Sequence, residues 1–165
     1  MKVTDVLASQ HTFLRSVFEV IERAMHETER HSDVAAYARL LEGLLRDHAE
    51  AEENLLFRPL DIMLTEKGGF SQFYSGHQEL DHLLKKPQME MSAAQARNLL
   101  HIAFRFMRSH FESEELMVIP LAEEMFQLES LETLGQAWMR RHTHPAALQS
   151  VAAIVADSRV AVAGR

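Results

Sequence analysis

Two short stretches of the chain carry a histidine followed four residues later by a glutamate, with a second glutamate directly after it. The first is His48 with Glu52 in the run HAEAEE, and the second is His110 with Glu114 in the run HFESEE. Residues i and i+4 lie on one face of an α-helix, so each pair can present an imidazole nitrogen and a carboxylate oxygen to the same point. Donors of these two kinds at this spacing indicate a metal site.

The two runs belong to an internal repeat. Each is followed by an apolar segment and a Pro-Leu pair, and each is preceded by another histidine with a leucine three residues later. These upstream histidines are His11 and His77, which lie 37 and 33 residues before the histidines of the two runs. The repeat predicts two helical hairpins of the same design, each offering one histidine from its first helix and a His/Glu pair from its second.

Four helices must position these residues, and the scarce turn residues mark where the helices end. The chain has 6 glycines and 4 prolines, too few for an all-β protein. Apolar spacing predicts helices over about 5–29, 34–66, 70–86 and 92–127, with Thr4 capping the first and a bend near Pro59 in the second. Amphipathic helices with short connections predict an all-α fold, an antiparallel up-down four-helix bundle.

The remainder of the chain is expected to extend this bundle. A short fifth helix is predicted over 130–143, with Trp138 packed against the bundle. The last twenty residues are small, apolar and rich in alanine, and their pattern supports no choice between helix, strand and tail. We therefore expect a bundle over residues 1–127 and a C-terminal extension over 128–165 that packs on the bundle or trails from it.

The amino-acid composition limits which kinds of catalytic and metal-binding site the chain can form. The 165 residues are 47% apolar and 25% charged, as in an ordinary soluble domain, and include 10 histidines but no cysteine. Without cysteine there is no disulfide, no thiolate nucleophile and no Cys-ligated zinc or iron–sulfur cluster, so nitrogen and oxygen must hold any metal. The net charge of −7 argues against nucleic-acid binding, and the lack of a long apolar run argues against a membrane protein. A cytoplasmic location is expected.

All the candidate site residues fall on helix faces that are predicted to form the core. A buried, unpaired carboxylate costs several kcal/mol or stays protonated, so several such groups in one core need a common partner, and a metal centre supplies it. The alternative is a metal-free helical regulator in which the histidines are ordinary hydrogen-bonded core residues. The six candidate metal ligands are His11, His48, Glu52, His77, His110 and Glu114.

These features together resemble the hemerythrin-like, or HHE cation-binding, family. The matching segments are His11, the HAEAEE and LFRPL run from His48, the HQELD run from His77, and the HFESEE and IPL run from His110, spanning residues 11 to about 121. The resemblance implies a non-haem di-iron centre inside the bundle, oxo- or hydroxo-bridged when oxidised. The four histidines are implied as terminal ligands, with Glu52 and Glu114 as bridges. Zinc or manganese is the alternative, since both suit the same donors.

Two positions leave the ligand set open. Oxygen-carrying members of the family have a second histidine four residues after the one on the third helix, whereas this chain has Asp81 there, so a coordination position is either open or filled by Asp81. The last motif offers Glu114 and Glu115 at i+4 and i+5, and the repeat favours Glu114. Glu53 and Glu115 are otherwise expected to hydrogen-bond to the ligands or to remain solvated.

The departure from the oxygen carriers shapes the expected function. With one histidine fewer, the resemblance points away from reversible oxygen carriage and toward a protein that binds or senses O2, nitric oxide or peroxide. The alternative is an enzyme of nitric oxide or peroxide detoxification, or an iron donor in the repair of iron centres.

Overall fold

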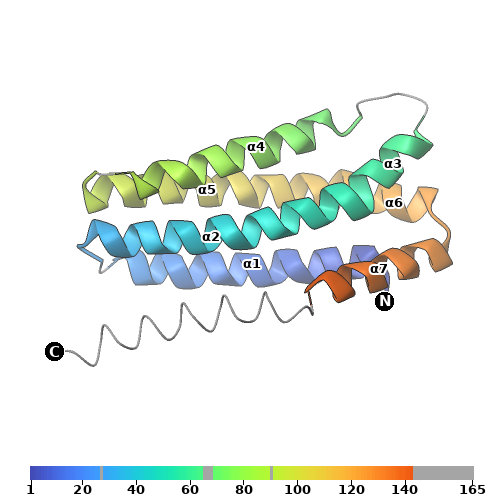
Figure 1. The fold of residues 1–165 in the computed structure, drawn as a ribbon, viewed down its shortest axis with the longest axis horizontal. Helices are drawn as coiled ribbons and strands as arrows, with labels where there is room; N and C mark the ends of the chain where they lie inside the picture. Colours follow the sequence, from blue (N-terminus) through green and yellow to red (C-terminus); the bar gives the residue numbers. More distant parts are fainter. Residues whose placement is uncertain (27, 65–68, 90, 143–165) are drawn as a thin grey trace.

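The computed structural model describes residues 1–26, 28–64, 69–89 and 91–142, and all the regular structure in them is helical. The helices are α1 (Val3–His26), α2 (His31–Glu52), α3 (Arg58–Met63), α4 (Ser71–Lys85), α5 (Ala93–Ser113), α6 (Ile119–Met125) and α7 (Leu128–His142). Helices α1, α2, α4 and α5 lie side by side as a bundle, which confirms the predicted fold class (Figure 1). None of the described helices combines the length and the apolar character that a membrane crossing requires.

A single π-helical turn interrupts each of the two helices that carry an HxxxEE run. The turns cover Glu53–Phe57, between α2 and α3, and Glu114–Val118, between α5 and α6. The backbone N–H of Arg58 donates to the carbonyl of Glu53, and that of Ile119 to Glu114, so each bond spans five residues. In both cases a proline follows one residue after the turn, and because it has no N–H it cannot donate to the carbonyl four residues back. The bend predicted near Pro59 is therefore a widened turn just upstream of it.

The helix starts differ in part from the prediction. The fourth predicted helix starts near residue 92 as expected, and Ser92 caps α5 in a reciprocal arrangement with Gln95 in which each side chain accepts from the other's backbone N–H. The predicted cap of the first helix was wrong: α1 already begins at Val3. Thr4 lies within its first turn, where its hydroxyl donates to Glu123 at 2.6 Å. The second helix likewise starts earlier than predicted, whereas its predicted end at residue 66 lies outside the described residues.

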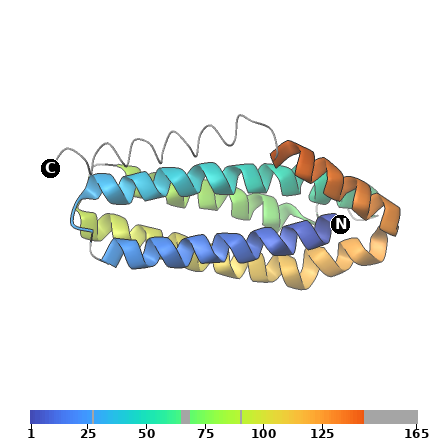
Figure 2. The same ribbon diagram turned by 90° about the horizontal axis from the view of Figure 1, so that it is seen from below.

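Helix α7 confirms the predicted fifth helix and covers one end of the bundle. It packs against α1 (Figure 2), and its own residue Trp138 is fully buried against the bundle. Gly135 permits this packing, because a Cβ there would lie 2.4 Å from the carbonyl oxygen of Met1. The division at residues 127 and 128 stays a prediction, and residues 143–165 lie outside the described part of the chain.

The core consists of two apolar clusters with a polar layer between them. On α1, His11 lies between Leu7, which belongs to one cluster, and Leu14, which belongs to the other. On α2 and α4 the histidine likewise separates residues of the two clusters, whereas beyond His110 the chain passes from one cluster to the other only between Phe111 and Val118. The bundle therefore places its histidines at one level along its length.

Candidate metal centre

The polar layer consists of six side chains that converge from the four long helices. Every one of them is buried, with 0 to 8% of its surface exposed. The structure thus brings together all six residues that the sequence predicts as metal ligands. They are His11 on α1, His48 and Glu52 on α2, His77 on α4, His110 on α5 and Glu114 in the π turn after α5.

The carboxylate of Glu52 faces histidines on both sides. Its Oε1 lies 3.2 Å from Nε2 of His48 and 3.4 Å from Nε2 of His11. Its Oε2 lies 3.2 Å from Nε2 of His77, on the neighbouring helix α4. The two oxygens therefore point to two different groups of imidazoles.

The carboxylate of Glu114 does the same from the opposite side of the bundle. Its Oε2 lies 3.4 Å from Nε2 of His11, whereas its Oε1 lies 3.0 Å from Nε2 of His110 and 3.7 Å from that of His77. The donor atoms form one group around His11 and His48 and a second around His77 and His110. The two glutamates span these groups, as carboxylates that bridge a pair of ions must.

Several buried nitrogen and oxygen atoms of the layer lack a hydrogen-bond partner among the described residues. Buried polar atoms are normally paired, because leaving one unpaired costs about 1–3 kcal/mol. Unpaired atoms that converge on one place therefore call for a common partner, and a cation satisfies both imidazole nitrogens and carboxylate oxygens. The unpaired atoms are Nε2 of His48, His77 and His110, Oε2 of Glu52 and both carboxylate oxygens of Glu114.

Outer hydrogen bonds orient three of the four imidazoles. In each, Nδ1 donates to a side-chain oxygen outside the layer, so Nε2 turns inward as a ligand atom. Such bonds fix the tautomer and the ring orientation of metal-binding histidines. The acceptors are Glu115 for His11 (3.0 Å), Gln10 for His48 (2.8 Å) and Glu53 for His77 (2.8 Å).

The two outer glutamates connect the hairpins crosswise. Glu53 of the first hairpin holds His77 of the second, and Glu115 of the second holds His11 of the first. Glu115 also accepts two hydrogen bonds from the guanidinium of Arg15, at 2.7 and 3.0 Å. Burial opposes ionisation of Glu115, but the bonds from Arg15 and His11 lower its pKa. Glu115 is therefore an orienting partner of His11, and Glu114 is the glutamate of this motif whose oxygens face the layer.

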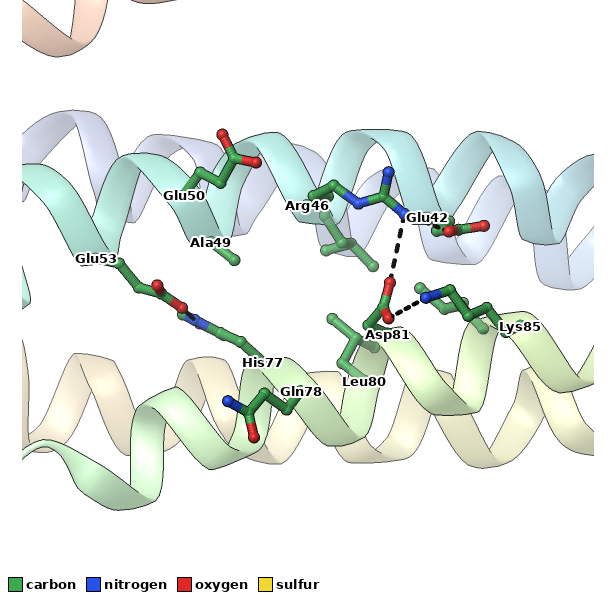
Figure 3. A pocket seen from close by; sticks show the side chains of 12 residues that line it. Glu42, Arg46, Ala49, Glu50, Glu53, His77, Gln78, Leu80, Asp81 and Lys85 are labelled. Atoms are coloured by element: carbon green, nitrogen blue, oxygen red, sulfur yellow. Dashed lines mark hydrogen bonds and ion pairs between the residues drawn. The ribbon is translucent and has the colours of Figure 1, made fainter.

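Asp81 points away from the layer. Its carboxylate pairs with Lys85 at 2.5 Å and with Arg46 at 3.4 Å, as Figure 3 shows, and its side chain is 40% exposed. The hydrogen bond from Lys85 lowers the pKa of Asp81, which matches a solvated ion pair. Asp81 therefore does not fill the coordination position that the missing histidine leaves.

The electrostatics of the layer favour an ionised carboxylate. Burial alone would raise the pKa of Glu52, but the charge of His48 and the close approach of three imidazole nitrogens hold it well below its usual range. Burial would lower the pKa of His77, yet the three carboxylates that surround its ring, those of Glu114, Glu52 and Glu53, raise it to about 10. The layer thus keeps the buried Glu52 carboxylate ionised and gives His77 a high affinity for a proton, and a cation that binds there takes the place of protons.

Gly76 makes room for His110. A Cβ at this position would lie 2.7 Å from both Cε1 and Nδ1 of the imidazole, closer than any relaxed contact permits. The ring of His110 packs edge-on against Phe73 and His77, which lie on α4 together with Gly76. The centroid distances are 5.9 and 4.9 Å. The ring therefore occupies the space that a side chain at position 76 would need.

We expect Gly76→Ala to weaken metal binding by about tenfold or more, because the displaced imidazole loses its ligand geometry. The matched control is Gly43→Ala on α2, where a Cβ would meet nothing within 4 Å. That control should raise the free energy of unfolding by about 0.5–1 kcal/mol, as alanine does in an exposed helix. Metal titration and thermal unfolding measure both effects. A Gly76→Ala protein that binds metal like the unmodified chain would contradict the role of Gly76.

Sequence reasoning missed three residues that support the layer. Gln10 and Arg15 flank His11, at one residue before it and four after it, and neither belongs to a repeated motif. Gly76 precedes His77 inside a predicted helix, and a glycine there was a usable signal of close packing.

Comparison with models of known protein families matches residues 2–122 to the hemerythrin HHE cation-binding domain. No curated protein and no solved structure matched the chain.

Proposed function

Because the chain belongs to the hemerythrin HHE cation-binding family, we propose that its buried histidine–glutamate layer holds two iron ions and that the protein binds or senses O2, nitric oxide or peroxide. The observation that favours two ions over one is the placement of Glu52 and Glu114, whose oxygens face both pairs of histidines. His11 and His48 would hold the first ion, and the second would lie between the remaining two histidines.

The donor set supports iron. Imidazole and carboxylate also suit zinc and manganese, so affinity alone does not select the metal. Carboxylate bridges stabilise ferric iron and neutral imidazoles keep ferrous iron accessible, which supplies a redox-active pair for small oxygen- or nitrogen-containing ligands. Each ion would receive two imidazole nitrogens and two carboxylate oxygens, fewer donors than an octahedral ion needs, so a position remains for an external ligand.

The protein around the ions would exclude water and keep the donors in place. The layer lies between two apolar clusters, and outer hydrogen bonds orient three of its imidazoles. A preorganised, largely dry site of this kind binds a small ligand without rearranging.

Metal analysis with an absorption spectrum tests the proposal. Protein purified with and without air should contain two irons per chain, and the air-exposed sample should show the bands of bridged ferric iron. One zinc per chain, or no metal, would contradict the di-iron centre.

An enzyme is the second candidate, since the position left for an external ligand also suits turnover. Adding nitric oxide or hydrogen peroxide to the metal-loaded protein distinguishes an enzyme from a binding or sensing protein. A stable adduct with no consumption of the added ligand identifies a binding or sensing protein, whereas continued consumption identifies an enzyme.

A further inference from the structure

The two halves of the layer are covered differently, and the His11 and His48 half is closed. The ring of Phe111 stacks on His11 with a centroid distance of 4.1 Å. Trp138 of α7, itself fully buried, lies edge-on against His48 at 6.0 Å. His11 and His48 are 0 and 3% exposed, whereas His77 and His110 are each 8% exposed, so the His11 and His48 half is the more fully enclosed.

The other half lies beneath a surface hollow. The hollow has a volume of about 280 Å³ and lies between α4 and α5, with His110 among the residues that line it. Gly76 lines it from α4, and Ser109 and Ser113 line it from α5. Because Gly76 has no side chain, the imidazole of His110 packs directly against α4 there and itself forms part of the wall of the hollow. A small molecule in this hollow would meet a predicted ligand of the second ion.

The lining of this hollow suits an uncharged ligand. Apart from His110, the described residues around it have no ionisable side chain, and they include the apolar Phe73, Phe106 and Met117. A small neutral molecule readily displaces water from such a surface. A charged molecule would lose its own hydration there without gaining a charged side chain as a partner.

A second hollow, of about 530 Å³ between α2 and α4, has the opposite character (Figure 3). It reaches His77, but Glu53 lies there and accepts a hydrogen bond from Nδ1 of that imidazole. Its charged lining favours water and ions over an uncharged molecule. The charged residues are Glu42, Glu50, Glu53, Asp81, Arg46 and Lys85.

We propose that a small uncharged ligand such as nitric oxide reaches the centre through the hollow between α4 and α5 and binds on the His77 and His110 half. This inference rests on the proposed function, since it needs a metal in the layer. The hollow supplies the entrance, the imidazole of His110 forms its inner wall beside Gly76, and the closed half holds its ion without contact to the entering ligand.

Filling the hollow tests the route. Ser109→Phe places a ring in the hollow from an exposed position, with Ser109→Leu as a smaller second variant. Ser75→Phe is the matched control, because Ser75 is an exposed α4 serine outside the lining of either hollow. Gln78→Phe fills the hollow between α2 and α4 instead. The probe is nitric oxide, added without air to reduced, metal-loaded protein in a stopped-flow spectrometer.

All four variants should keep the metal content of the unmodified chain. The association rate of nitric oxide should fall about ten- to a hundredfold in Ser109→Phe, less in Ser109→Leu, and about twofold or less in the other two. Unchanged rates in both Ser109 variants, or a larger decrease in Gln78→Phe, would overturn the route. Unmodified protein without bound metal would instead reject the proposed function, so the two failures are distinguishable before any kinetics are measured.

Discussion

Replacing Glu114 by glutamine is expected to reduce the metal content from two ions per chain to one or none, with an affinity loss of more than about a hundredfold for what remains. Both oxygens of Glu114 are buried without a hydrogen-bond partner among the described residues, and they face opposite pairs of histidines. An amide keeps the shape of the side chain but loses its charge and one of its two acceptor oxygens. Metal analysis of the purified variant measures the loss.

The adjacent glutamate is the control for this prediction. Glu115→Gln should keep both ions and lose only about ten- to a hundredfold in affinity, because Glu115 orients His11 from outside the layer and pairs with Arg15. The opposite result, with both ions kept in Glu114→Gln and lost in Glu115→Gln, would show that the second glutamate of the motif is the bridge. Circular dichroism should show unchanged helix content in both variants.

Removing the metal is expected to destabilise the protein by about 8 kcal/mol, if each of two ions is present at about a thousand times its dissociation constant and each then contributes about 4 kcal/mol. For a chain of this size the midpoint of thermal unfolding should fall by roughly 20 °C. The physical reason is that the metal-free layer leaves buried carboxylates and imidazoles unpaired between two apolar clusters. Thermal unfolding before and after treatment with a chelator measures the difference.

Two variants show whether this loss comes from the layer. Asp81→Asn should show the full effect of the chelator, because Asp81 pairs with Arg46 and Lys85 away from the layer. Glu114→Gln should show a much smaller effect, because it binds less metal from the start. Equal unfolding midpoints for loaded and chelator-treated protein would rule out a structural contribution of the metal.

Features of the layer that involve residues of a single helix could be predicted from the amino-acid sequence alone. The pairs His48 with Glu52 and His110 with Glu114 share a helix face because 3.6 residues make one turn, and this relation needs no neighbour. The apolar residues around each pair indicate that this face is inside. The repeat adds that two such hairpins meet, which is why all six candidate residues lie in one layer in the folded protein.

The roles that depend on contacts between helices could not be predicted. Glu114 and Glu115 differ by about 100° around the helix, and only the position of α1 shows that the second of them meets His11 and Arg15. The placement of Asp81 depends on the cations on α2 and α4 that surround it. The widened turns before the two prolines also rotate the downstream residues about the helix axis, which a regular helical pattern does not reveal.

The donor types, their spacing and their inward direction were thus legible in the sequence, because they depend on bonds and periodicity within single helices. The crosswise bonds from Glu53 and Glu115, the support of His48 by Gln10, and the close approach of His110 to Gly76 were settled by the packed bundle. These contacts depend on how four helices are rotated and spaced against one another. That geometry results from the packing of both apolar clusters at once, so no single segment of the chain contains it.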